Sequence, residues 1–136
     1  MGAGAGAGVG ANRAEEVLPS GKRLIRYRNG TVKEVELDGT SVVRFMNGDT
    51  KTARSDSVVY YYAEAETTHT TYADGQEVYE FPNKQTEMHN PDGVKEIVFP
   101  DGTRKIIRPD GTQESHFPDG VVLREFADGR REVMSN

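Results

Sequence analysis

The chain has 136 residues, no cysteine, no tryptophan and a formal net charge of −5 at pH 7, a length that suits one domain. The absence of cysteine excludes a disulfide framework and a thiolate metal site, and the slight acidity argues against an electrostatic nucleic-acid binder. Leu, Ile, Val and Phe together make up about 20% of the chain, which undersupplies an ordinary packed core. Composition therefore leaves two classes, a disordered segment or a thin β structure.

The N-terminal segment differs from the rest of the chain. Residues 2–10 alternate glycine with alanine or valine and lack both the basic region and the continuous apolar stretch of a signal peptide. No apolar run approaches the roughly 20 residues that a membrane helix needs, so we expect no membrane partner. We predict a flexible Gly/Ala-rich tail over residues 1–19 and one folded domain over residues 20–136.

The folded part is an internal repeat of nine residues. Ten glycines lie outside the tail, and every gap between them is a multiple of nine. These glycines are Gly21, Gly30, Gly39, Gly48, Gly75, Gly93, Gly102, Gly111, Gly120 and Gly129. All six prolines stand two residues before a glycine position of this repeat, so proline and glycine share one register.

The repeated Pro-Asp-Gly segment specifies a hairpin loop. Proline presets φ for a type I turn, Asp suits the next position, and glycine accepts the left-handed conformation that closes a three-residue loop. About six residues rich in Val, Ile, Thr, Tyr and Phe remain for each strand, whereas Gly and Pro recur too often for a helix. The sequence predicts an all-β protein, a single-layer antiparallel meander of about 11–13 short strands exposed on both faces.

Three glycine positions of the repeat are occupied by other residues, Ser57, Glu66 and Lys84. The stretch 58–72 runs through the second of them without Gly or Pro. The turn near Ala65 is therefore poorly specified, and we expect a longer strand pair or a register shift there.

Aromatic residues recur just before every second loop. Stepping by eighteen residues gives Tyr27, Phe45, Ala63, Phe81, Phe99 and Phe117, of which five are aromatic. Three-residue loops place this series on one side of the sheet, which we name the aromatic face. We assign to it Val43, Phe45, Tyr79, Phe81, Glu87, Ile97, Phe99 and Ile107. The same register places Tyr61, and not Tyr60, on this face.

The opposite face is predicted to be mostly polar, and lysines and glutamates also interrupt the aromatic face. Such a sheet stands as a single layer stabilised by cross-strand pairs, each worth roughly 0.2–1 kcal/mol. A closed barrel is the alternative, against which the charges on both faces weigh. The basic segment 22–28 is predicted to be the first strand, with its charges protecting an open edge.

No catalytic or metal-binding signature is present. The nonapeptide has one glycine where a calcium-binding β-roll needs three, and its Asp is explained by the turn. His69, His89 and His116 lie in different repeats without ligand spacing. We expect a non-enzyme with no catalytic residues, no metal and no cofactor.

An exposed aromatic row with interleaved charge is typical of a recognition surface. Aromatic grooves suit proline-rich peptides, whose extended polyproline conformation loses little entropy on docking. The competing interpretation is that the aromatic residues merely pack against their cross-strand neighbours.

Two segments carry a more specific signal than the repeat itself. They are V-V-Y-Y-Y-A-E-A-E-T-T-H-T-T-Y-A-D-G over 58–75 and F-P-N-K-Q inside 80–93. With the repeated F-P-D-G-T units, they resemble the C-terminal G-box domain family of CPAP (centromere protein J) and T-complex protein 10. The resemblance covers roughly residues 23–133. It implies a non-enzymatic scaffold module of centriole duplication, located in the cytoplasm at the centriole, centrosome or basal body.

The resemblance also implies a partner and a site. The partner is a proline-rich motif of a STIL-type centriole assembly protein. The family's peptide-binding aromatic residues fall on Phe45, Tyr60 and Phe81, and an acidic position falls on Glu87. Tyr79 and Phe99 join the expected peptide-binding residues because they share the aromatic face.

Two other hypotheses remain. In the first, the chain is a structural module that self-assembles through sheet edges or ends into a homo-oligomer. In the second and weakest, it has the transcription-related role suggested for some T-complex-like proteins, although no DNA-reading element supports nucleic acid as a partner.

Overall fold

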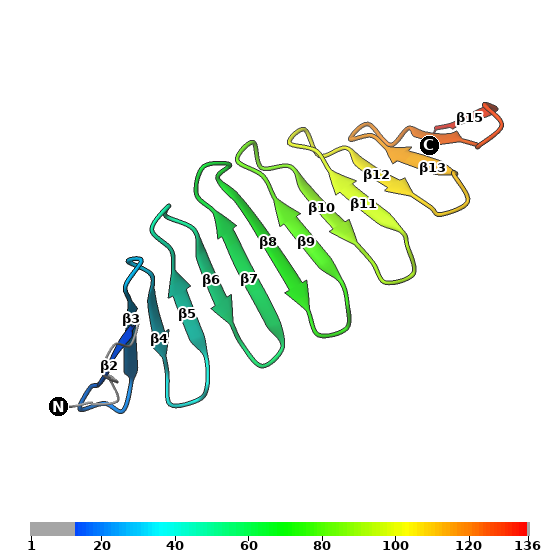
Figure 1. Ribbon diagram of the computed structural model, residues 1–136. Helices are drawn as coiled ribbons and strands as arrows, with labels where there is room; N and C mark the ends of the chain where they lie inside the picture. The colour runs from blue at the N-terminus through cyan, green and yellow to red at the C-terminus, as the bar shows by residue number, and fades with distance from the viewer. Residues whose placement is uncertain (1–12, 136) are drawn as a thin grey trace. The chain divides into compact units, whose positions relative to one another are not determined.

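The computed structural model describes residues 13–135 of the chain, and Figure 1 shows strands joined by tight loops throughout. These residues form fourteen strands and no helix, so none of their elements is a helix able to cross a membrane. The chain divides into two compact units, Met1–Glu66 and Thr67–Asn136.

The first unit is a meander of six strands. They are β2 (Arg13–Val17), β3 (Arg23–Tyr27), β4 (Val32–Val35), β5 (Ser41–Arg44), β6 (Thr50–Ala53) and β7 (Ser57–Tyr62). Each strand pairs antiparallel with the next along the chain. The unit has no pairing between its first and last described strands, so it is an open sheet.

The second unit repeats this arrangement with eight strands. They are β8 (Thr67–Tyr72), β9 (Glu77–Glu80), β10 (Thr86–His89), β11 (Lys95–Val98), β12 (Arg104–Ile107), β13 (Gln113–His116), β14 (Val122–Glu125) and β15 (Arg131–Met134). Again only consecutive strands pair, all of them antiparallel. The predicted all-β antiparallel meander is therefore confirmed, and the barrel alternative is wrong for the described residues.

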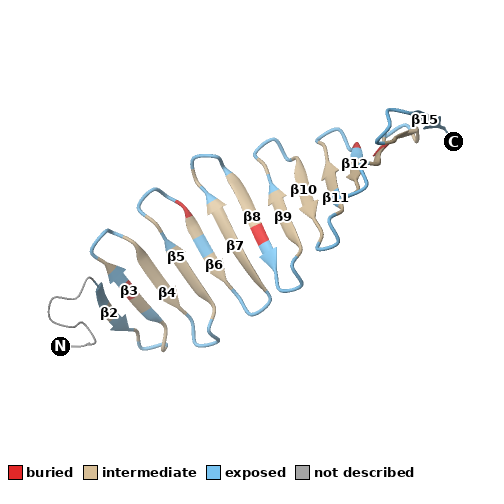
Figure 2. Cartoon of the chain, turned by 45° about the vertical axis from the view of Figure 1, so that its right-hand side comes forward, coloured by how far each residue is buried: buried red, intermediate tan, exposed pale blue. Residues whose placement is uncertain are grey.

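Each unit is a single layer with almost no core. Among the described residues Ile25 is the one buried hydrophobic side chain, at 4% exposure, and most strand positions are half-buried (Figure 2). No buried side-chain polar atom of the described residues lacks a hydrogen-bond partner. Because one layer has nothing to pack against, its stability depends on backbone ladders and cross-strand pairs.

The loops that contain a repeat glycine, and the loop at Lys84, have the predicted three-residue geometry, and a side chain in each adds a hydrogen bond. In the loop after β9, Phe81 N–H donates to Gln85 O and Lys84 N–H donates to Phe81 O, both at 2.9 Å. The Oδ1 atom of Asn83 then accepts from Gln85 N–H at 2.9 Å. The Asp or Asn before the glycine position makes this bond in loop after loop, as Asp101 does to Thr103. Asp at this position of the repeat therefore has two roles: it suits the turn conformation, and its Oδ1 atom accepts a hydrogen bond from the backbone N–H two residues later.

The domain boundary differs from the prediction. The tail was expected to reach residue 19, but residues 13–17 form β2, so the sheet begins at least seven residues earlier. The reason is local: Leu18 N–H donates to Lys22 O at 2.8 Å, so Pro19-Ser20-Gly21 is itself a hairpin loop that requires a strand on both sides. Residues 1–12 of the expected flexible tail lie outside the described residues.

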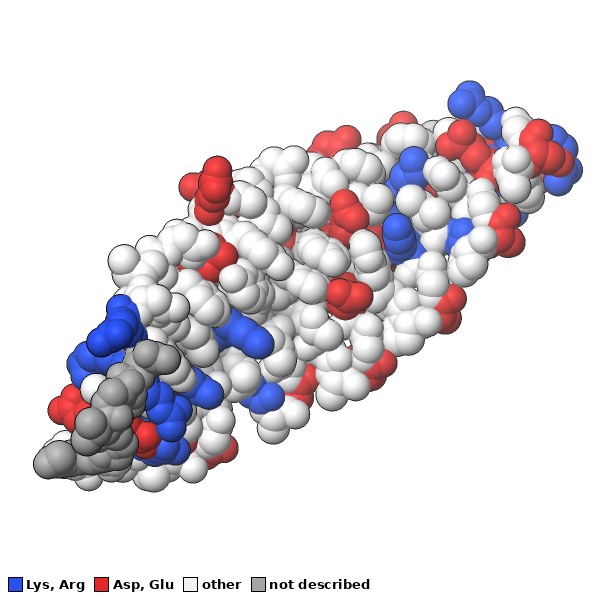
Figure 3. Space-filling view, in the orientation of Figure 1, with Lys and Arg blue, Asp and Glu red and all other residues white. Residues whose placement is uncertain are grey.

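The same strand corrects the predicted edge. β2 pairs with β3, and its Glu15 and Glu16 form ion pairs with Arg23 and Arg26. Lys and Arg side chains gather over this end of the first unit in Figure 3. The basic residues of β3 therefore serve cross-strand pairing rather than protection of an open edge.

Candidate functional site

The loop before Ser57 lacks a glycine, and its length determines which tyrosine of β7 lies on the aromatic face. Arg54 N–H donates to Ser57 O at 2.8 Å, so this loop contains two residues rather than three. The shorter loop shifts the register of β7 by one residue, which moves every side chain of the strand to the other face. Lys51 is consequently the Cα partner of Tyr60, and Thr50 that of Tyr61.

The prediction that Tyr61 lies on the aromatic face is therefore wrong, and Tyr60 takes its place. Val43 and Lys51 are Cα partners, as are Lys51 and Tyr60, so all three share one face. Phe45 follows Val43 by two positions and belongs to the same face. The fold thus places Tyr60, the position that the family resemblance indicated, on the same face as Phe45.

Phe45 and Tyr60 form the first aromatic cluster. Their ring centroids are 5.9 Å apart with an interplanar angle of 29°, and the centroid of Tyr62 lies 4.4 Å from that of Tyr60. Phe45 and Tyr60 are half-buried, and Tyr62 is exposed. The cluster presents flat apolar surface to solvent, the type of surface on which a proline ring packs.

Asp49 fixes the position of the Tyr60 ring. The Tyr60 hydroxyl donates to Asp49 Oδ2 at 2.9 Å, and Ala63 N–H donates to Asp49 Oδ1 at 2.8 Å. The Ala63 amide, followed by the Tyr60 hydroxyl, holds the pKa of the Asp49 carboxyl below its usual range. The same carboxylate raises the pKa of Tyr60. One feature of the sequence indicates that Asp49 has a role other than turn formation: it is the one Asp that lies outside the turn position of the repeat.

The second unit carries its own aromatic cluster around Tyr79. The His69 and Tyr79 rings stack with centroids 4.3 Å apart and an angle of 1°, and the His89 ring lies 5.0 Å away. The centroid of Phe81 is 6.3 Å from that of Tyr79 at an angle of 11°. Sequence reasoning missed the two histidines as cluster members, because it judged them for metal binding and not for stacking.

Glu87 lies directly beside this cluster. It is the Cα partner of Tyr79 on one side and of Ile97 on the other, so it shares the aromatic face as predicted. Its Oε1 atom lies 3.3 Å from Nε2 of His89. The carboxylate is half-buried, which makes it a strong acceptor for a donor on a bound chain.

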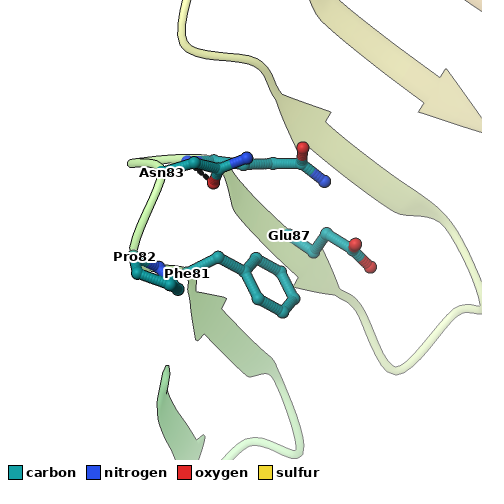
Figure 4. Close-up of a pocket in the computed structure, with 5 residues that line it drawn as sticks. Phe81, Pro82, Asn83 and Glu87 are labelled. Carbon is teal, nitrogen blue, oxygen red and sulfur yellow. Dashed lines mark hydrogen bonds between the residues drawn. The ribbon is translucent and has the colours of Figure 1, made fainter. Parts of the chain in front are cut away.

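A pocket opens between Phe81 and Glu87. It has a volume of about 440 Å³ and is lined by Phe81, Pro82, Asn83, Gln85 and Glu87. Figure 4 shows the Phe81 ring and the Glu87 side chain extending in the same direction from neighbouring strands, with Asn83 at the loop above them. The pocket combines an aromatic wall with a carboxylate and amide groups. A peptide can therefore contact it through apolar rings and through hydrogen bonds.

Phe99 occupies a different place from the other predicted residues. It follows Ile97 by two positions and so lies on the aromatic face. It is half-buried, but it does not line the pocket, and the described residues include no ring pair that contains it. The second unit thus brings Tyr79, Phe81 and Glu87 together and leaves Phe99 to one side.

Comparison with known proteins places this geometry in a family. The profile described as T-complex protein 10 C-terminus matches residues 67–107 and 109–134. The TCP10 domain of Danio rerio CPAP, solved in complex with a peptide of Danio rerio STIL, is 52% identical with a TM-score of 0.80. The alignment covers 91% of this chain and 70% of that one. The chain belongs to the T-complex protein 10 C-terminal domain family.

Two further relatives give the range of similarity. The TCP domain of Drosophila melanogaster Sas-4, solved with a proline-rich motif of Ana2, is 33% identical with a TM-score of 0.71. That alignment covers 96% of this chain and 94% of the Sas-4 chain. The Centrosomal P4.1-associated protein of Mus musculus is 50% identical over 79 residues, which are 57% of this chain and 6% of the mouse protein. The chain thus matches a small part of this curated relative.

Proposed function

We propose that the chain is a non-enzymatic interaction domain that binds a proline-rich peptide of a STIL-type protein. The observation that carries the proposal is the pair of aromatic clusters on the aromatic faces of the two units, which have exposed or half-buried rings and no covering layer. Two solved relatives of this family are complexes with a STIL peptide and with a proline-rich motif of Ana2. We propose the same class of ligand for this chain.

The proposed contacts follow from the geometry of each unit. In the first unit, Phe45 and Tyr60 supply stacked rings. In the second, Tyr79 and Phe81 supply rings beside the Glu87 carboxylate, and Phe99 extends the same face. A proline-rich segment is already extended, so it docks on such surfaces at a small entropic cost. Since the relatives are centrosomal proteins, we propose that this domain acts as a centriolar scaffold in the cytoplasm.

Calorimetric titration with a proline-rich STIL peptide tests the proposal. Phe81→Ala is expected to weaken binding at least tenfold, because a buried aromatic anchor contributes about 2 kcal/mol or more. Phe126→Ala is the matched control. Phe126 follows Arg124 of the opposite face by two positions, and it packs under Arg130 with 4.5 Å between guanidinium carbon and ring centroid. Equal affinity of the Phe81 variant and the wild type, with both folded, would refute the proposal.

Self-assembly is a second candidate function, favoured by one observation on β15. Every residue of this strand is exposed, Val133 at 70% and Met134 at 42%, and among the described residues it pairs with β14 alone. A strand of this kind can pair with another chain. Light scattering over a concentration series would detect an oligomer, and a monomer at every concentration would contradict this function.

A further inference from the structure

Two lysines lie beside the first aromatic cluster. In the row that crosses the sheet, Lys33 is the Cα partner of Val43, Val43 is that of Lys51, and Lys51 is that of Tyr60. Partner residues share a face, so both ammonium groups are on the aromatic face with Phe45 and Tyr60. Lys51 is exposed and Lys33 is half-buried.

Neither lysine has an ion-pair partner within the described part of the chain, whereas the arginines of the neighbouring strands β3 and β5 do. On the opposite face Arg26 pairs with Glu16 at 3.2 Å, and Arg44 pairs with Glu34 at 3.0 Å. On the aromatic face Arg23 pairs with Glu15. The unit therefore neutralises these arginines and leaves two positive charges next to the proposed peptide surface.

The nearest candidate counter-ion on this face is already engaged. Asp49 precedes Lys51 by two positions, but one of its oxygens accepts from the Tyr60 hydroxyl and the other from Ala63 N–H. Its carboxylate thus positions the aromatic ring. A ligand carboxylate is the chemically complementary group for the two free ammonium groups.

The spacing of the lysines matches a polyproline helix. Lys33 and Lys51 are separated by one strand, which puts their backbones about 9.6 Å apart across the sheet. A polyproline helix has three residues per turn and rises about 3.1 Å per residue, so residues three apart lie about 9.3 Å apart on the same side. Two acidic residues at positions i and i+3 of such a peptide would face both lysines.

We infer that the ligand of the first unit is an acidic proline-rich peptide, with Asp or Glu at two positions three residues apart. Lys33 and Lys51 bind these carboxylates, and prolines beyond the second acidic position pack on Tyr60, which follows Lys51 in the row. This inference rests on the proposed function and adds charge selectivity to it.

The test uses three synthetic peptides of about twelve residues, proline-rich and identical except at two positions three apart, which carry Asp, Asn or Lys. Each is titrated calorimetrically into the full chain at low and at high salt. The Asp peptide is expected to bind about fivefold more tightly than the Asn peptide at low salt, since exposed ion pairs each contribute modestly. The advantage should shrink at high salt because the charges are screened.

Charge reversal gives the sharper result. The Lys33→Glu/Lys51→Glu variant is expected to lose the preference for Asp and to favour the Lys peptide. Arg54→Glu is the matched control, because Arg54 is an exposed cation without an ion pair in the described residues, and it follows Thr52 of the opposite face by two positions. It should leave the ranking of the peptides unchanged. Circular dichroism confirms that each variant is folded.

Two outcomes overturn the inference. Equal affinities of wild type for the Asp and Asn peptides would overturn it, as would an equal loss of selectivity in the Arg54 variant, which would indicate bulk charge. Phe45→Ala separates this failure from that of the proposed function. If Phe45→Ala weakens all peptides while Asp and Asn peptides bind equally, the charge inference alone fails. If the STIL peptide binds the wild type but none of these three does, the inference alone fails. If the STIL peptide does not bind either, the proposed function fails and the inference with it.

Discussion

Three loops of this protein lack the repeat glycine, and two of them, at Lys84 and at Ser57, have different effects on the strand that follows. The loop at Lys84 keeps three residues, because Lys84 itself adopts a φ of 73°, and its hydrogen bonds match those of the glycine loops. The loop at Ser57 has two residues, so the register of the next strand shifts by one. Loop length, rather than glycine as such, determines which side chains reach the aromatic face.

The largest effect is expected from restoring the missing loop glycine at position 57. Ser57→Gly is predicted to take residue 57 into a three-residue loop over 55–57 and to return β7 to the register of the repeat. Tyr61 would then replace Tyr60 beside Phe45, and the bond from Tyr60 to Asp49 would be lost. Peptide titration should show loss of binding. Ser55→Gly, which keeps the loop length, is the control, and unchanged affinity of the Ser57→Gly variant would contradict the register account.

The glycine loops themselves offer a matched pair of substitutions. Gly93 and Gly39 have φ values of 89° and 90°, so alanine is strained at both by about 1–2 kcal/mol. An added Cβ at Gly93 would lie 2.9 Å from Pro109 Cγ, whereas nothing lies within 4 Å at Gly39. Chemical denaturation is expected to show a larger loss for Gly93→Ala. Equal losses would show that the neighbouring loop adjusts freely.

A smaller effect concerns pH. The backbone N–H groups of Thr103 and Thr112 lower the pKa values of Asp101 and Asp110 below the ordinary range. Because the folded-state pKa is depressed, this stabilisation is present above the unfolded pKa and is lost as pH falls through the folded pKa. Thermal unfolding should therefore show declining stability at acidic pH. An Asp101→Asn/Asp110→Asn variant should decline less, since Asn83 makes the same loop bond without a charge. An identical pH profile would contradict this account.

The smallest effect is expected at Lys84. Replacement by glycine removes the strain of a positive φ but adds freedom to the unfolded chain, so Lys84→Gly should stabilise by less than about 1 kcal/mol. Denaturant unfolding can measure this difference. Destabilisation by the substitution would show that the Lys84 side chain contributes more than its backbone strain costs.

Most of the fold could be predicted because its determinants are local. A three-residue loop and a period of nine fix which residues pair, so Tyr79, Glu87 and Ile97 fall into one row as expected. The position of Tyr60 could not be derived from the repeat, because it depends on a hydrogen bond between Arg54 and Ser57 that spacing does not reveal. Strand β2 was missed because its sequence lacks the repeat signature, although Pro19-Ser20-Gly21 marks the loop that follows it.

Only part of the candidate site could be predicted from the sequence. Counting along the strands assigned Phe45, Phe81 and Glu87 to the aromatic face, since alternation sets the face, but it chose Tyr61 in place of Tyr60. The contacts of Asp49 with Tyr60 and of His69 with Tyr79 depend on side-chain rotamers in three dimensions. Ring stacking and side-chain hydrogen bonds of this kind cannot be predicted from the spacing of residues along the sequence.

One pair of neighbouring residues tests the central claim most directly. Tyr60 and Tyr61 are adjacent in β7 and, by the pairing of β6 with β7, lie on opposite faces. In calorimetric titration with a proline-rich STIL peptide, Tyr60→Ala is predicted to weaken binding at least tenfold while Tyr61→Ala stays close to wild type. The reverse order, or equal affinities of the two variants, would contradict the assignment of the aromatic face as the peptide-binding surface.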